Sequence, residues 1–226
     1  MIDWAFQYRV ESHINIEHIR KSLVDMIFQC LESRMPLHQD EFHKRIPKLH
    51  HGSYSGRAGR DLNASLGELI WKHSELTGKY CGCQFWSVSA KRLFDTKLLE
   101  LVDGRPPTST DASDVACFLS KKIHGEKQLV HEHVFPRAEL RALLGREVRL
   151  DYQYVAETIE RLAVGCVVLE NEHKLVNRTK GDSINPWRRY GGKIKLFENE
   201  NWPISHPSHL ELIKHAELLR PKMTGR

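Results

Sequence analysis

One carboxylate and two histidines in the C-terminal half of the chain have side chains that suit metal-dependent phosphodiester hydrolysis. Glu132 and His133 stand together in HEHVFPR, residues 131–137, and His173 follows in CVVLENEHKLVN, residues 166–177. Such a reaction needs a base that activates water and a cation that stabilises the charge developing on the phosphate and the leaving oxygen. A neutral imidazole can act as the base, and a carboxylate with an imidazole can bind a divalent ion. These residues therefore predict a hydrolytic metal site.

The segments around these residues predict two strands and a helix. KQLVHEHVFPR, residues 127–137, has the pattern of a strand that ends or turns at Pro136. CVVLE, residues 166–170, is a short apolar strand candidate with β-branched side chains. NEHKLVNR, residues 171–178, has the pattern of a helix start, with Asn171 as its N-cap. The expected order is strand, helical insertion, strand, helix.

This order limits how the side chains can meet. Adjacent residues on a strand point to opposite sides, so Glu132 and His133 share one site only if the strand twists or bulges, or if metal and water sit at its edge. His173, on the first helical turn, can reach back over the strands. Asn177 lies one turn further along the same helix face.

These segments resemble the HNH, or ββα-metal, nuclease superfamily over roughly residues 129–178. Glu132-His133-Val134-Phe135-Pro136 looks like its first-strand signature, and residues 167–173 look like its strand-to-helix half. The resemblance implies that Glu132 and His173 bind the metal and that His133 is the general base. It makes Asn177 a candidate third ligand or phosphate contact. It also implies a divalent ion, Mg²⁺ first with Mn²⁺ or another ion as alternatives, and products with 5′-phosphate and 3′-hydroxyl ends.

The chain departs from the family pattern in three ways. The family's middle Asn has no clear counterpart, 40 residues separate His133 from His173, and the Cys-x-x-Cys pairs of zinc-supported members are absent. His131 is an alternative ligand that would leave Glu132 outside the site. Cys81 and Cys83, with Cys117 or a nearby His, could form a separate zinc site, although buried free thiols also explain them.

Several basic side chains are candidate nucleic-acid contacts: Arg137, Lys174 and Arg178 beside the site, and Arg188 and Arg189 in the segment Trp187–Tyr190. For that segment, a buried Trp with snorkelling arginines is the competing interpretation. Residues 55–60, SGRAGR, form either an anion-binding loop or an ordinary glycine loop.

The charge distribution favours a polyanionic partner. The net charge is +5, and all of the excess lies after residue 120, because Lys and Arg balance Asp and Glu over residues 1–120. We expect double-stranded DNA as the partner, while RNA and a homo-oligomer remain open.

The N-terminus has no basic start followed by an apolar run, and no apolar stretch approaches the roughly 20 residues that span a bilayer. We therefore expect a cytoplasmic protein without a membrane partner.

The expected fold class is α+β, with a helix-rich N-terminal domain over 1–105, a linker over 106–114 and a C-terminal HNH nuclease domain over 115–226. The Pro, Ser, Thr and Asp content of DGRPPTSTDASD, residues 103–114, motivates the boundary. Apolar periodicity predicts helices over 14–33, 66–76, 138–145, 154–165 and 209–221. Residues 79–95 are expected to form strand or irregular core. Residues 185–203 are expected to form a loop with one strand.

The sequence thus predicts a metal-dependent HNH endonuclease that acts on DNA, a type suited to restriction or phage defence. One alternative is a non-catalytic nucleic-acid-binding protein that keeps an HNH-like fold. Another is a metal-dependent hydrolase with a different substrate, for which no HExxH or comparable signature is present.

Overall fold

The computed structural model of the chain describes residues 16–46, 54–76, 80–122, 125–146, 150–177, 185–191 and 194–198. Most of these residues are helical, and one small sheet joins them, which shows the expected α+β class. The α-helices are α2 (Ile16–Ser33), α3 (Gln39–Arg45), α4 (Leu62–Glu75), α5 (Val88–Val102), α6 (Ser109–Ser120), α7 (Arg137–Gly145), α8 (Tyr152–Leu162) and α9 (Glu170–Asn177). The strands are β1 (Phe85–Ser87), β2 (Leu129–His133), β3 (Gly165–Leu169) and β4 (Leu196–Glu198), and two short 3₁₀ helices are η1 (Ala58–Arg60) and η2 (Pro186–Arg189).

The sheet has four strands in the order β2-β3-β1-β4, so β2 lies at an edge. β2 and β3 are antiparallel, β3 and β1 are parallel, and β1 and β4 are antiparallel. The helices α7 and α8 connect β2 to β3, and α9 begins at the residue that follows β3. β2, β3 and α9 therefore have the predicted order of strand, helical insertion, strand and helix.

Alternation along the strands gives the sheet two buried faces. Leu129 of β2 and Val167 of β3 pack on one face in a core that includes α5 and α6. Val168 packs on the other face with Val176 of α9 and Trp187 of η2. The sheet is therefore covered on both sides, and a polar side chain on either face needs a partner.

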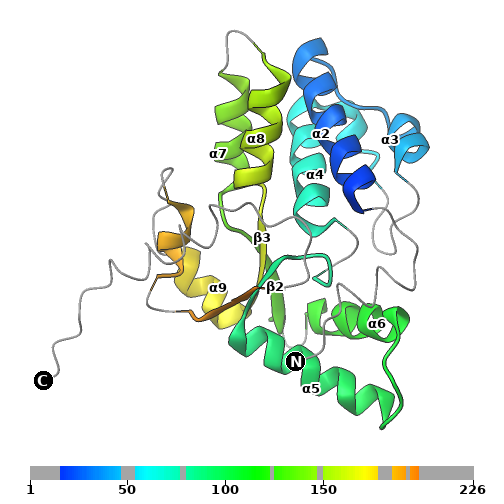
Figure 1. Ribbon diagram of the computed structural model, residues 1–226, viewed down its shortest axis with the longest axis vertical. Helices are drawn as coiled ribbons and strands as arrows, with labels where there is room; N and C mark the ends of the chain where they lie inside the picture. The colour runs from blue at the N-terminus through cyan, green and yellow to red at the C-terminus, as the bar shows by residue number, and fades with distance from the viewer. Residues whose placement is uncertain are drawn as a thin grey trace, which may run out of the picture.

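The helices α2, α4, α7 and α8 stand side by side above the sheet, with α5 and α6 below it (Figure 1). Their shared core joins apolar residues of α2 and α4 to Leu140 and Leu144 of α7 and Ile159 of α8. The N-caps Asp61 of α4 and Asp151 of α8 accept hydrogen bonds from backbone N–H groups of their first turns. The predictions of helices near 14–33, 66–76, 138–145 and 154–165 are confirmed.

Three α-helices were missed by the sequence interpretation: the short α3, and α5 and α6. Residues 79–95 were expected to be strand or irregular core, but only β1 is a strand, and α5 begins directly after it with Ser87 as N-cap. The predicted linker over 106–114 is wrong beyond residue 108, because α6 begins at Ser109. Its Ser, Thr and Asp residues form a capping box in which Thr108 and Asp111 bond each other's backbone N–H groups.

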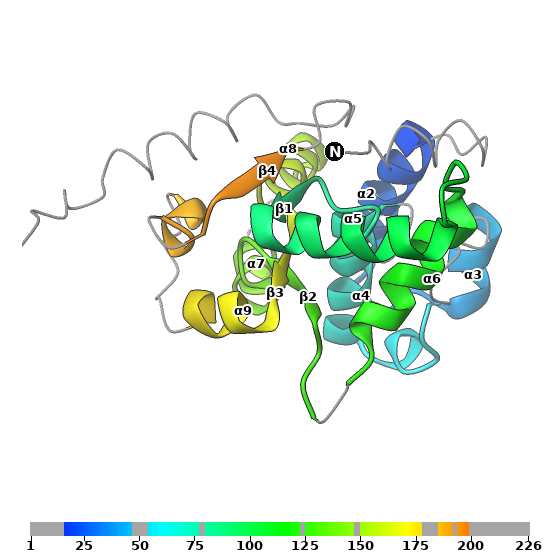
Figure 2. The ribbon, with the colours of Figure 1, turned by 90° about the horizontal axis from the view of Figure 1, so that it is seen from below.

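Elements on both sides of residues 106–114 build the same sheet, since β1 lies between β3 and β4. Figure 2 shows α5 running across β1, while α9 lies beside β3. The core of the helical bundle also combines residues from both sides, such as Leu69 and Leu140. In the described part of the chain, the segment does not separate two hydrophobic cores. The predicted helix over 209–221 lies outside the described residues, and no described helix is long and apolar enough to cross a bilayer.

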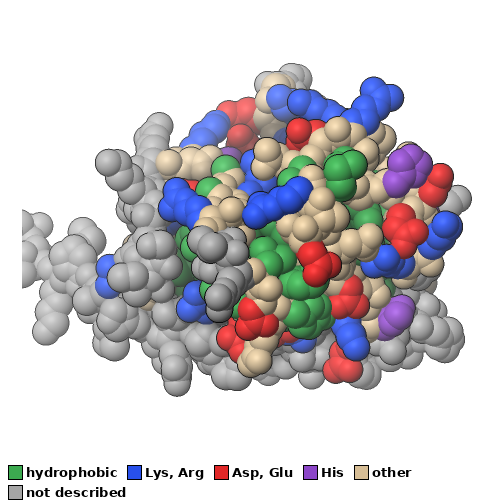
Figure 3. Space-filling model, turned by 90° about the horizontal axis from the view of Figure 1, so that it is seen from above, with side chains coloured by type: hydrophobic (Ala, Val, Ile, Leu, Met, Phe, Trp, Pro, Cys, Tyr) green, Lys and Arg blue, Asp and Glu red, His purple; other side chains and the backbone are tan. Residues whose placement is uncertain are grey.

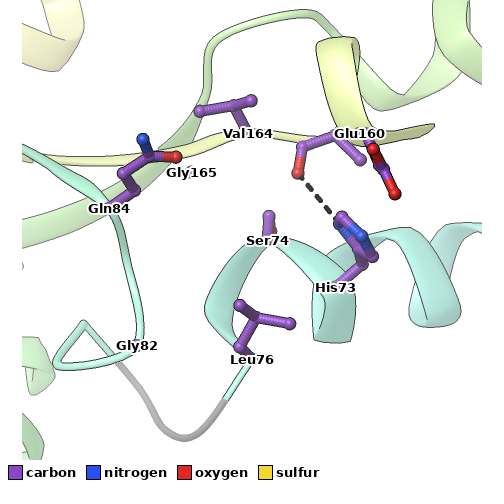
Figure 4. A pocket seen from close by; sticks show the side chains of 9 residues that line it. His73, Ser74, Leu76, Gly82, Gln84, Glu160, Val164 and Gly165 are labelled. Carbon is purple, nitrogen blue, oxygen red and sulfur yellow. Dashed lines mark hydrogen bonds between the residues drawn. The ribbon is translucent and has the colours of Figure 1, made fainter. Parts of the chain in front are cut away.

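A cavity of about 20 Å³ lies where α4 meets the start of β3, lined by residues that include His73, Ser74 and Gly165 (Figure 4). His73 is buried there, and its Nδ1 lies 3.3 Å from the carbonyl oxygen of Ala163. Burial lowers the pKa of His73 to about 4, whereas an unfolded histidine titrates near about 6.5. The folded protein therefore holds His73 neutral at a pH where the unfolded chain is already protonated.

The free energy of unfolding should consequently be highest above about pH 6.5 and fall as the pH is lowered towards 4, with His73 contributing a loss of about 3 kcal/mol. His73→Gln should make this decline shallower in urea unfolding at several pH values. His18→Gln, at an exposed site on α2, is the control and should keep the wild-type dependence. An unchanged decline in His73→Gln would contradict the assignment.

Candidate metal centre

The carboxylate of Glu132 is the centre of a buried polar cluster on one face of β2. Its side chain is only 8% exposed. Oε1 accepts a hydrogen bond from Nη2 of Arg189 at 2.7 Å, and Oε2 lies 2.6 Å from Nδ1 of His173. Glu132 pairs with Cys166 across the β2–β3 ladder, which sets the side chain on the face covered by α9 and η2. The structure thus brings together the two residues expected to bind metal.

Arg189 also bonds the backbone at the end of β2. Its Nη1 donates to the carbonyl oxygens of His133 and Val134 at 3.0 and 3.1 Å. Trp187 is buried in the sheet core and Asn185 caps η2, so the short helix is anchored and the Arg189 side chain points inwards. The prediction that Arg189 contacts phosphate is therefore wrong, because its side chain is only 6% exposed and its guanidinium is already bonded within the protein. Arg188 is exposed.

The first turns of α9 position His173 and Asn177. Glu172 fixes the start of the helix, since its Oε2 accepts hydrogen bonds from the Leu169 N–H at 2.9 Å and from the Ser87 hydroxyl at 2.5 Å. Nδ2 of Asn177 lies 2.8 Å from Nε2 of His173, one turn away. The prediction of Asn171 as N-cap is wrong, because α9 already begins at Glu170 and Asn171 lies in its first turn.

Glu132 and His173 supply one oxygen and one nitrogen that could bind a small divalent cation. Nδ1 of His173 is buried and lies 2.6 Å from Oε2 of Glu132, so without a cation the two groups form an ion pair when His173 is protonated. Adjacent Mg²⁺ ligands at about 2.1 Å from the ion lie about 3 Å apart, so the pair must open slightly to bind one. The described residues hold no group of three His, Cys, Asp or Glu suited to a metal. The amide of Asn177, the predicted third ligand, faces Nε2 of His173 and accepts a hydrogen bond from Nη2 of Arg189 at 3.4 Å through Oδ1, so it lies beside the ring nitrogen that does not face Glu132.

His133, the candidate base, lies on the opposite face of β2. The ladder continues without a bulge through the Glu132–Cys166 and His133–Gly165 pairs, so the two side chains diverge. The His133 ring lies 5.2 Å from the ring of Trp71 and 4.7 Å from that of His131, measured between centroids. Neither ring nitrogen has a hydrogen-bond partner among the described residues. Burial, with the nearby charges of His131, Arg137 and Arg189, lowers the pKa of His133 well below its usual value, which keeps the ring neutral.

His131, the alternative ligand, is engaged elsewhere. Its Nδ1 lies 2.8 Å from Oε1 of Glu75, and its Nε2 lies 3.2 Å from the hydroxyl of Ser74. The fit is tight, because a Cβ added to Gly165 would lie 2.8 Å from that Nε2 and 2.6 Å from the Ser74 carbonyl oxygen. The structure therefore brings Glu132, not His131, to His173.

The other predicted basic residues that the structure describes do not join the Glu132 cluster. The Arg137 guanidinium lies over the Trp71 ring at 4.5 Å, and Lys174 forms an ion pair with Glu126 at 2.6 Å. Arg178 lies outside the described residues. The alternative zinc site is not assembled among the described residues: Cys81 is a buried thiol that donates to the Ala112 carbonyl, and burial raises its pKa to about 12.

Sequence reasoning missed Trp71 and Glu75, which pack on the His131–His133 face from α4. They stand one helical turn apart, a spacing that places both on one face, but nothing local to α4 indicates that this face meets β2. Comparison of the chain with protein-family models, with curated proteins and with solved structures finds no match. The assignment of this site therefore rests on the residues and their geometry.

The buried Glu132–Arg189 pair leads to a stability prediction. Removing one partner leaves an uncompensated charge in the protein interior, so Arg189→Met should lower the free energy of unfolding by about 3–5 kcal/mol. Arg188→Met, one residue earlier and exposed, is the matched control and should change it by about 0.5 kcal/mol or less. Glu132→Leu combined with Arg189→Met should recover part of the loss. Equal stabilities for the two single variants in denaturant unfolding would contradict the pairing.

Proposed function

We propose that this protein is a metal-dependent DNA endonuclease of the HNH type. The observation that carries the proposal is the convergence of Glu132 from β2 with His173 from α9, their donor atoms 2.6 Å apart, at a hairpin followed by a helix. The order of elements and the pairing of these two side chains are the ones that the resemblance implies. A carboxylate, an imidazole and an amide are oxygen and nitrogen donors that suit Mg²⁺ or Mn²⁺.

In this proposal Glu132 and His173, with Asn177 as third donor, would hold the divalent ion. The bound ion would supply positive charge for the phosphate and the leaving oxygen. Arg189 orients the carboxylate through Oε1, which leaves Oε2 directed towards His173. The protein's own contribution is thus a carboxylate fixed in direction before any ligand arrives.

His133 is the proposed base that takes a proton from the attacking water. Its ring is neutral, and its two nitrogens are buried without a hydrogen-bond partner among the described residues, so the ring can take a proton only from a water that enters the site. Because Glu132 and His133 lie on opposite faces of β2, an edge strand, one substrate would have to lie across that edge to meet both side chains.

Plasmid DNA incubated with Mg²⁺ or with EDTA tests the proposal, with single-stranded DNA and RNA as further substrates. We expect nicking with Mg²⁺ alone, a large loss of activity in Glu132→Gln, and a higher metal requirement in His173→Ala that excess metal partly offsets. Glu170→Gln and His43→Ala, outside the cluster, are controls and should behave as the wild type. DNA binding by the wild type without cleavage of any substrate would instead favour a non-catalytic nucleic-acid-binding protein.

His133→Ala should lower the cleavage rate by roughly 10²–10⁴-fold, because a general base contributes about that much. DNA binding measured in EDTA should stay near the wild-type value, since the ring is buried against Trp71 and His131. His38→Ala, at an exposed residue before α3, serves as the control. Turnover by purified, folded His133→Ala close to that of the wild type would remove His133 from the mechanism.

A further inference from the structure

An open groove of about 590 Å³ lies between α7 and the segment formed by η1 and α4. Three arginines line it: Arg57 from the turn before η1, and Arg137 and Arg141 from α7. The groove therefore combines a basic residue of the N-terminal half with two from the segment that follows β2. Its volume lies within the roughly 300–1,000 Å³ of typical ligand sites.

Glu68 also lines the groove, so its lining carries three positive charges and one negative charge. No described carboxylate forms an ion pair with Arg57, Arg137 or Arg141. Burial, and next the charge of Arg141, lower the pKa of Arg137, while the charges of Glu68 and Glu75 partly offset this shift. Like charges held together in a groove are stabilised by an anion that binds between them.

Both arginines of α7 are held in place through α4. Nη1 of Arg137 donates to the Gly67 carbonyl at 3.2 Å, and Nη1 of Arg141 donates to the Asn63 carbonyl at 2.7 Å. Gly67 makes room for this arrangement, because a Cβ there would lie 3.2 Å from Nη1 of Arg141. Nε of Arg141 is buried and has no hydrogen-bond partner among the described residues. The side chains are thus fixed, with donor capacity left over.

We propose that this groove binds the phosphodiester backbone of the nucleic-acid substrate, an inference that rests on the proposed nuclease function. Guanidinium groups bind phosphate oxygens through two parallel hydrogen bonds, and Arg137 and Arg141 lie one helical turn apart, about 6 Å along α7. Contacts of this kind set the position of a strand without reading its sequence.

The groove is connected to the proposed base through Trp71. Arg137, one of its lining residues, lies over the Trp71 ring, and the Trp71 ring contacts that of His133. A strand lying along Arg57, Arg141 and Arg137 is therefore directed to the end of β2. The wider surface does not offer the same attraction everywhere, because on the face seen in Figure 3 basic and acidic side chains are intermixed.

Binding of a labelled DNA duplex, measured by fluorescence anisotropy in EDTA at several salt concentrations, tests this inference without cleavage. Each lost phosphate contact should flatten the dependence of log affinity on log salt concentration by about 0.9 for B-DNA. Arg57→Gln with Arg141→Gln should thus flatten the slope by up to about two units. Arg57→Lys with Arg141→Lys should keep most of the slope. Arg92→Gln with Arg146→Gln, both exposed and outside the groove, is the control.

A flatter slope in the Gln pair alone supports the groove, and a slope equal to that of the wild type overturns it. If the Gln pair does not fold, as judged by thermal melting, Arg57→Gln at an exposed side chain decides, with an expected change of about 0.9. Mg²⁺-dependent cleavage by the wild type with no change in slope would overturn the groove and leave the nuclease function standing. A changed slope without cleavage of any substrate would support the groove as a nucleic-acid-binding surface and overturn the nuclease function.

Discussion

A buried carboxylate must be paired, and the arrangement around Glu132 follows from that requirement. Oε1 is paired with Arg189, and Oε2 lies against His173, so β2, η2 and α9 are held to one point. Arg189 also bonds the carbonyl oxygens of His133 and Val134, where β2 ends. The end of the edge strand, one face of α9 and the end of η2 therefore meet at one polar cluster.

The same strand carries a second polar cluster on its other face, and the helical bundle supplies its partners. Glu75 and Ser74 of α4 hold His131, while Trp71 covers His133 and in turn lies under Arg137. The α7–α8 insertion packs against α2 and α4, which brings these side chains to β2. The helices before β1 thus help to build the candidate site, and the groove between α4 and α7 extends it.

Local patterns were sufficient to predict β2, β3 and the five helices α2, α4, α7, α8 and α9, while the meeting of Glu132 with His173 was expected from the family resemblance. Period-two alternation and β-branched residues identify β2 and β3, and helical periodicity identifies α2, α4, α7 and α8. The helix α6 was interpreted as a linker because Thr108 and Asp111, which cap it, belong to residue types that are also common in loops. Composition alone therefore does not distinguish a helix cap from a loop.

What could not be predicted depends on contacts between distant segments. Arg189 sits beside an aromatic residue in a basic segment, which is equally typical of a nucleic-acid contact, and only its distance to Glu132 shows that it is buried. The charge count placed the excess after residue 120, whereas the basic groove includes Arg57. Glu75 and Trp71 carry no local mark of their proximity to β2, because the packing of α4 on that strand decides it.

Mn²⁺ bound in a crystal of the protein, located through its anomalous scattering, tests most directly whether Glu132 and His173 hold a divalent ion. We expect one Mn²⁺ within coordinating distance of Oε2 of Glu132 and Nδ1 of His173, with Arg189 still bonded to Oε1. We also expect the anomalous peak to be lost in His173→Ala crystals. Mn²⁺ bound only elsewhere, or no Mn²⁺ bound at millimolar concentration while Glu132 keeps its contacts, would show that this pair is not a metal site.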